Sequence, residues 1–386
     1  MVIALGGIAA AASPTAPTAV AVPASVDQPT DVAVSTPPPS PLLPPLAPSL
    51  PRRGLALGAT LVPGLALHGV GHIAAGDRAT GVRLLAWEGI GLASIVAGVG
   101  GLAVTGASSR TVALFIPLMI GGAGLFGTTW LSDVYGVAAT PRVPGGPRPP
   151  PRLEAQAGIR YVYDPVFTYR TLLVAALELR PGRFRLSPSA WLATNGDNQR
   201  LRAEGAWRLF GPTPAAGGDP AAPATVDGSY LDLEVAATHH RYVAEREQFA
   251  FTLGEASLGG RFDLRRAARS LDGSFVEAAL GWAVGGITYF GRTTDPTELL
   301  LGRLGWGIYW GGRGARHGEV ALGYDHRHDG YAGGMKLSGL GSGTMGSFGV
   351  RASGMLSPLF GVIAEARVGS AYVVGASLLV RPGGTP

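Results

Sequence analysis

Residues 200–209, RLRAEGAWRL, alternate between two kinds of side chain. One set is apolar or small: Leu201, Ala203, Gly205, Trp207 and Leu209. The other set carries the charges: Arg200, Arg202, Glu204 and Arg208. Because successive side chains of a β-strand point to opposite faces, this period of two predicts a strand with one dry and one wet face.

The same alternation recurs throughout residues 153–386. It is clearest at 230–235, 258–264 and 360–368. Shorter examples lie at 159–163, 171–179, 183–192, 275–290, 299–310, 319–324, 331–339, 347–356 and 372–380. Turn sequences such as RPGR (180–183) and SPLF (357–360) separate consecutive runs. We therefore expect about a dozen strands of roughly 8–12 residues, long enough to cross a membrane when tilted.

Two architectures fit such a set of strands. A β-sandwich must fill a space of about 10 Å between its sheets with large side chains. The apolar positions here are rich in Ala, Gly, Val and Leu, and lipid outside a closed sheet explains a dry face without a second sheet. The sequence therefore predicts a mainly β protein with an antiparallel transmembrane β-barrel of about 12 strands over 153–386. Aromatic residues near strand ends, such as Trp306, Tyr309 and Trp310, are expected to form interfacial girdles.

A hydrophobic helical region precedes the barrel at 54–140. Segments 54–75, 84–104 and 111–131 are mostly apolar and about 20 residues long, which is the length of a membrane-spanning helix. We expect two to three helices, arranged as a hairpin or small bundle. His68 and His72 would share a helix face and are weak candidates for metal ligands. The favoured alternative is a hydrogen-bonded pair that helps the helices to pack, because no third ligand lies nearby in the sequence.

Proline-rich segments flank the helical region. Residues 1–21 have an apolar core and small-residue sites, as in a secretory signal peptide. Residues 22–53 and 141–152 are expected to be Pro-rich linkers, since proline fixes φ and has no N–H to donate. An ordinary N-terminus without a signal is the alternative for 1–21.

The composition excludes several classes of protein. The 386 residues include 60 glycines and no cysteine, and Lys336 is the single lysine. Without cysteine there is no disulfide scaffold, thiol catalysis or thiolate-bound metal. A net charge of +5 without a dense basic stripe gives no support for nucleic-acid binding. No motif for a cofactor occurs, so none is expected.

The barrel segment resembles bacterial outer-membrane β-barrel proteins in its glycine-rich strands that favour arginine over lysine. The resemblance is one of general pattern, and the final strand lacks the terminal aromatic residue typical of that class. It implies a location in the outer membrane and contact with membrane lipid. An inner-membrane protein with a soluble periplasmic β-domain remains the alternative. Other envelope proteins could bind the Pro-rich or helical regions.

Charged residues of mixed sign are predicted to line the lumen. They are Arg200, Arg202, Glu204, Arg208, Asp232, Glu234, Arg261, Asp263, Glu277, Arg303, Glu319, Arg351, Glu365 and Arg367. Because unpaired charges away from water are costly, these side chains should form ion pairs in a packed lumen or a narrow pore.

Catalysis has weaker support. Some outer-membrane barrels are lipid-modifying enzymes, and such a site would need histidines; the weak candidates are His239, His240, His326 and His328. No serine motif flanks them, so an enzyme is the less favoured reading. The expected function is a structural or passive transport role in the outer membrane, with a lipid-modifying barrel enzyme as an alternative.

Overall fold

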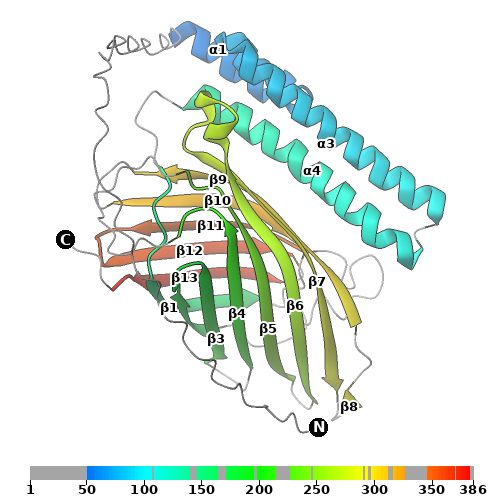
Figure 1. Cartoon of the computed structure of the whole chain (residues 1–386), viewed down its shortest axis with the longest axis vertical. Coiled ribbons are helices and arrows are strands. Elements are labelled where there is room, and N and C mark those ends of the chain that lie inside the picture. The colour runs from blue at the N-terminus through cyan, green and yellow to red at the C-terminus, as the bar shows by residue number, and fades with distance from the viewer. Residues whose placement is uncertain are drawn as a thin grey trace, which may run out of the picture. The chain divides into compact units, whose positions relative to one another are not determined.

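Twelve strands close into an antiparallel barrel, preceded by four α-helices, in a computed structural model of the chain (Figure 1). The structure describes residues 50–106, 108–139, 146–163, 171–194, 198–213, 227–244, 247–289, 292–293, 297–311, 316–326, 346–369 and 371–382. The predicted signal peptide and most of the first linker therefore lie outside the described residues, as do the predicted strand 331–339 and His328.

The barrel strands follow one another around the ring in chain order. They are β1 (Leu153–Tyr163), β2 (Thr171–Leu179), β3 (Phe184–Ala193), β4 (Gln199–Phe210), β5 (Tyr230–Ala244), β6 (Glu247–Asp263), β7 (Ser274–Tyr289), β9 (Thr297–Trp310), β10 (His317–Asp325), β11 (Ser347–Met355), β12 (Phe360–Val368) and β13 (Tyr372–Val380). Within the described residues, the two-residue strand β8 (Arg292–Thr293) pairs with the end of β7 alone. Pairing of β1 with β13 closes the ring, which confirms the predicted barrel of about 12 strands.

The two faces of the wall differ as the alternation predicts. Leu201, Leu233 and Leu378 are among the large apolar side chains exposed on the outside. The charged side chains between them turn inward and line the lumen. An exposed apolar surface of this extent is stable only where lipid, rather than water, covers it.

The described part of the chain before the barrel has four α-helices: α1 (Leu50–Leu61), α2 (Val70–Ala75), α3 (Arg78–Thr105) and α4 (Ser109–Ala138). Among the described residues, two helical spans are long and apolar enough to cross a membrane, Arg78–Thr105 and Thr111–Ala138. These helices form a tight hairpin because glycines sit at their contact. A Cβ on Gly122 would lie 2.6 Å from the carbonyl oxygen of Gly91, so only glycine permits this approach.

The segment 54–75 differs from the single long helix that its apolar length predicts. Pro63 opens a short 3-10 turn, and Gly69 has a φ of 91°, so α1 and α2 are separate short helices. Proline removes a helical N–H, and the left-handed backbone of Gly69 cannot continue a right-handed helix. His68 therefore precedes α2 and does not share a helix face with His72.

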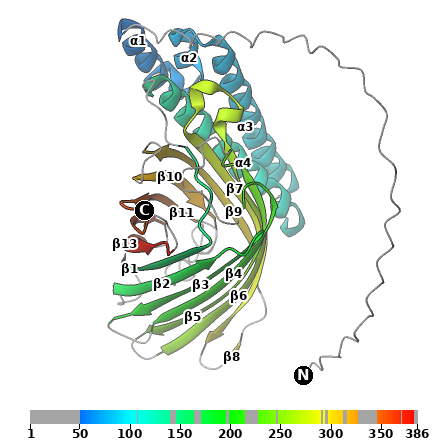
Figure 2. The same cartoon turned by 60° about the vertical axis from the view of Figure 1, so that its left-hand side comes forward.

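The hairpin packs on the outside of the barrel beside β7 and β9 (Figures 1 and 2). Trp306 of β9 donates a hydrogen bond from Nε1 to Ser132 of α4, at 3.2 Å, and its ring meets that of Tyr135 edge-on. Tyr135 in turn donates to the carbonyl of Asp272, at 2.8 Å. Trp306 is thus covered by helix, and it does not belong to the interfacial girdle predicted for it. Tyr309 does not belong to it either, because its hydroxyl meets Arg261 in the lumen.

Candidate functional site: the barrel lumen

Two polar chambers occupy the lumen. The first, of about 350 Å³, is lined at one end by Gly146–Pro151, and we call it the proline chamber. The second, of about 320 Å³, is lined by Trp191, and we call it the tryptophan chamber. Both are lined by Glu154, Glu178, Arg185, Arg303, Arg351 and Ile363. The chambers therefore meet at a charged boundary.

Arginine–carboxylate pairs tie the strands together across the lumen. Arg261 of β6 donates to Glu277 of β7 and, at 2.7 Å, to Glu319 of β10. Since β7 and β9 lie between β6 and β10 in the ring, the second pair crosses part of the lumen. Arg185 similarly bridges Glu204 at 3.0 Å and Glu234 at 2.9 Å. These pairs narrow the passage and compensate charges that are largely shielded from water inside the barrel.

Positive charge is in excess around the two chambers. Twelve arginines and ten carboxylates line them. Arg303 and Arg351, at the boundary, form no ion pair with any residue that the structure describes. The lumen can therefore attract small anions.

An apolar cluster lies inside the barrel next to the tryptophan chamber. We call it the apolar seal; its buried members are Val162, Leu172, Phe251, Leu253, Ala283, Leu301, Ala371 and Val373. They come from β1, β2, β6, β7 and β9 and from the start of β13, so the cluster reaches across the barrel. Trp191 packs against it, with the guanidinium groups of Arg160 and Arg200 at 3.9 and 4.1 Å from the centre of its ring. In channels, hydrophobic constrictions block ions because they exclude water.

The Pro-rich segment occupies the other end of the lumen. Arg180 donates to the carbonyl of Pro151, at 3.0 Å. A Cβ on Gly228 would lie 2.6 Å from Pro147, which shows how closely the segment packs against the barrel rim. The described part of the predicted linker 141–152 is therefore a constituent of the lumen wall.

Most of the predicted lumen charges line the chambers. Asp263 differs: it lies at the end of β6 and accepts hydrogen bonds from the backbone N–H groups of Gly228 and Arg265, at 3.3 and 3.2 Å. The charge pattern of the sequence did not lead us to predict four further charged residues that line the chambers: Arg160, Glu178, Arg185 and Glu255. Arg185 lies between outward-facing Phe184 and Leu186, so the period of two contained the signal that would have found it.

The three candidate catalytic histidines that the structure describes, His239, His240 and His326, are not brought together. His239 faces outward, where its Nδ1 lies 2.9 Å from Thr252 Oγ1. His240 faces inward and is fully buried, with Nε2 at 3.0 Å from Asn198 Oδ1. His326 follows β10, on a different part of the ring, where its Nδ1 lies 2.7 Å from Tyr324. Neighbouring strand positions that face opposite sides of the wall cannot serve one catalytic site.

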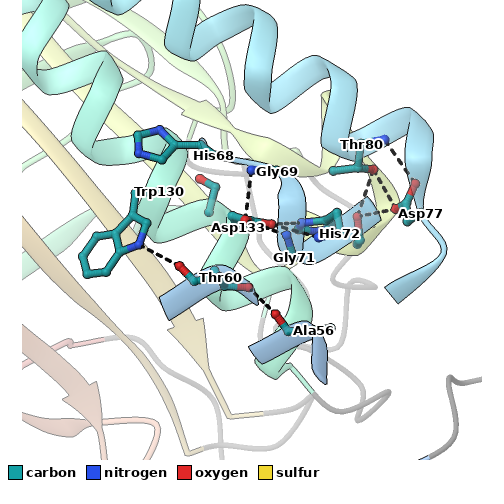
Figure 3. Close-up of polar contacts among 12 residues, drawn as sticks. Ala56, Thr60, His68, Gly69, Gly71, His72, Asp77, Thr80, Trp130 and Asp133 are labelled. Carbon is teal, nitrogen blue, oxygen red and sulfur yellow. Dashed lines mark hydrogen bonds and ion pairs between the residues drawn. The ribbon is translucent and has the colours of Figure 1, made fainter. Parts of the chain in front are cut away.

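The histidines of the helical region are held by separate partners (Figure 3). His72 Nδ1 lies 2.5 Å from Asp133, whose carboxylate also accepts the N–H groups of Gly69, Gly71 and His72. His68 Nδ1 instead lies 2.7 Å from Thr129 Oγ1. No cluster of three or more metal-ligating side chains occurs among the described residues. The hydrogen bonds that Asp133 and Thr129 of α4 form with residues 68–72 hold the segment between α1 and α2 against α4.

No family model matches the chain, and no curated protein matches it. Among solved structures, it is similar to the outer membrane protein Omp33 of Acinetobacter baumannii, at 11% identity and a TM-score of 0.28, over 60% of this chain and 98% of that one. It is also similar to the translocator domain of the autotransporter NalP from Neisseria meningitidis, at 11% identity and a TM-score of 0.33, over 59% of this chain and 88% of that one. A third similar structure is the beta domain of the Bordetella autotransporter BrkA, at 13% identity and a TM-score of 0.29, over 62% and 100% of the two chains.

Proposed function

We propose that the chain is an outer-membrane β-barrel protein that passes small hydrophilic solutes passively through a narrow, gated pore. The observation that carries the proposal is a polar lumen with the apolar seal, the largest apolar cluster among the described residues, next to the tryptophan chamber. A smaller apolar cluster of Met355, Ile363 and Leu379 lines the proline chamber. The chambers are charged enough to hold water and ions, whereas the apolar seal repels them. The resting barrel is therefore closed, and displacement of the seal opens it.

The location is supported by the lipid-facing belt and by the helical hairpin. The helices pack against the outer wall of β9, and their other faces carry exposed apolar residues such as Ile90, Val96 and Leu114. Hairpin and barrel would then share one bilayer, which argues against a soluble periplasmic β-domain. Separation of inner and outer membranes on a density gradient should place the chain in the outer fraction. Recovery of residues 153–386 as a soluble protein without detergent would contradict this location.

The role of the apolar seal as a gate can be tested by measuring conductance across a planar lipid bilayer. Phe251 is 5% exposed and lies within the seal. Phe251→Ala should convert a barrel of low conductance into one that conducts steadily, because a shortened side chain lets water through. Phe262 lies on the same strand but faces lipid, with 43% exposure, so Phe262→Ala is the matched control and should leave the conductance unchanged. Equal conductance of wild type and Phe251→Ala would contradict the proposal.

A further inference from the structure

The hydrogen-bonded ladder between β2 and β3 is interrupted at one point. It runs from Leu172↔Ala193 to Ala176↔Ser189 and resumes only at Leu179↔Leu186. Between them lies Pro188, which has no N–H to donate. On its other side β3 pairs with β4 without a break, through Pro188↔Ala203. The missing donor thus weakens the wall on the β2 side alone.

A groove on the outer face meets the lumen at this interruption. The groove has a volume of about 660 Å³ and crosses β2 to β6, with outward side chains that include Leu177, Leu201 and Ala203. Ala176, Leu177, Pro188, Ser189 and Arg202 line both the groove and the tryptophan chamber. Lipid and the polar lumen are therefore separated here by the interrupted part of the wall only.

The chemistry on the two sides of the interruption is different. The outer groove is almost entirely apolar and suits one hydrocarbon chain. The tryptophan chamber is lined by seven arginines and six carboxylates, and its Arg303 and Arg351 form no ion pair with the described residues. Beside the interruption, the buried hydroxyl of Ser187 makes no hydrogen bond within the described part of the chain. This combination favours a molecule with an apolar chain and an anionic head.

We propose that the wall at Pro188 is a lateral portal for a single-chain fatty acid. Its chain would lie in the outer groove, and its carboxylate would enter the tryptophan chamber. Because the apolar seal lies beyond that chamber, the portal provides access to the lumen from the bilayer even while the pore is closed. The portal is independent of the proposed conductance, since it uses the side of the barrel rather than its ends.

Successive side chains of β3 face the lumen and the outside in turn, so the position of a covalent adduct reports which side of the wall the carboxylate has reached. A fatty acid with a photoreactive diazirine next to its carboxylate is added to the full-length protein in phospholipid vesicles and illuminated, and the adducts are mapped by mass spectrometry. We expect adducts on lumen-facing Ser187, Ser189 or Trp191. Adducts confined to outward-facing residues, such as Leu186 and Ala190, would mean that the acid stays in the groove, and would overturn the proposal.

A disulfide between β2 and β3 can lock the wall at the interruption. The chain has no cysteine of its own, so an introduced pair of cysteines has no other intramolecular partner. Oxidised Leu177→Cys/Pro188→Cys should lose the lumen-facing adducts. The matched control is oxidised Leu173→Cys/Leu192→Cys, a registered pair on the same two strands and the same face, and it should retain them. Adducts that persist in the locked protein would overturn the portal. The corresponding alcohol should label the lumen less than the acid, and equal labelling would overturn the role of the carboxylate.

Discussion

Asp77 ties the start of α3 to the barrel. Its carboxylate accepts the backbone N–H of Thr80 at 3.1 Å, the hydroxyl of Thr80 at 2.7 Å and the hydroxyl of Ser270 at 2.9 Å. Burial alone would raise the pKa of Asp77, but the hydrogen bonds from Thr80 and Ser270 outweigh it and hold the pKa below its usual range. A carboxyl with a lowered folded pKa stabilises the fold above its unfolded pKa and loses that effect as pH falls through the folded value.

Asp77→Asn isolates this charge, since asparagine is also a good N-cap. At neutral pH the wild type should be more stable than the variant by about 1 kcal/mol, because hydrogen bonds to a charged group are stronger. The difference should vanish as the pH falls from about 5 through the lowered pKa of Asp77. Urea unfolding in detergent, followed by circular dichroism at several pH values, measures it. A difference that stays constant over this range would show that the carboxylate charge has no part in the cap.

At the level of single residues, the sequence indicated which side chains are charged and inward but not which partners they take. His68 and His72 illustrate the limit. Their spacing of four predicts a shared helix face, yet α1 ends before Pro63, and Gly69 separates His68 from α2, which contains His72. Both breakers are visible in the sequence, but proline and glycine are common in membrane helices, so neither alone decides where a helix stops.

At the level of elements, strands with one charged face were the easiest to predict. The run 360–368, with Glu365 and Arg367 on one face, matches β12 residue for residue. The apolar seal was not predicted, because its strands are apolar on both faces. In TLLVAALEL (171–179) the inward Leu172 and outward Leu173 look alike, so no alternation shows which end of the lumen is dry.

The Pro-rich segment at the rim of the lumen is an element whose role can be tested. Replacing GPRPPP (146–151) by GSGSGS should loosen the segment, because each proline removed restores about 0.4–1 kcal/mol of chain entropy to the open form. A thiol reagent should then modify Ser353→Cys, in the proline chamber, about tenfold faster or more. An unchanged rate would show that the segment does not restrict the chamber. Ala352→Cys, one residue away and absent from the chamber lining, should react at the same rate with either segment.

Over the whole molecule, the excess of arginine should set the selectivity of the opened pore. In the Phe251→Ala background, reversal potentials in a salt gradient should show a preference for anions. Arg303→Gln together with Arg351→Gln leaves ten arginines against ten carboxylates around the chambers, and the preference should disappear. Arg78→Gln, at the exposed start of α3, removes a charge outside the lumen and should not alter it. An anion preference that survives the double substitution would place the selectivity elsewhere.

The pairing of β1 with β13 determines when the cylinder is complete. The first and last strands of the barrel are ring neighbours, so β1 lacks one of its two partners until residues 372–380 are in place. A chain that ended before this strand would present two unsatisfied edges, one on β1 and one on β12. Such edges recruit foreign strands, so premature termination near the C-terminus should produce intermolecular sheets and proteolysis, and not a slightly smaller barrel.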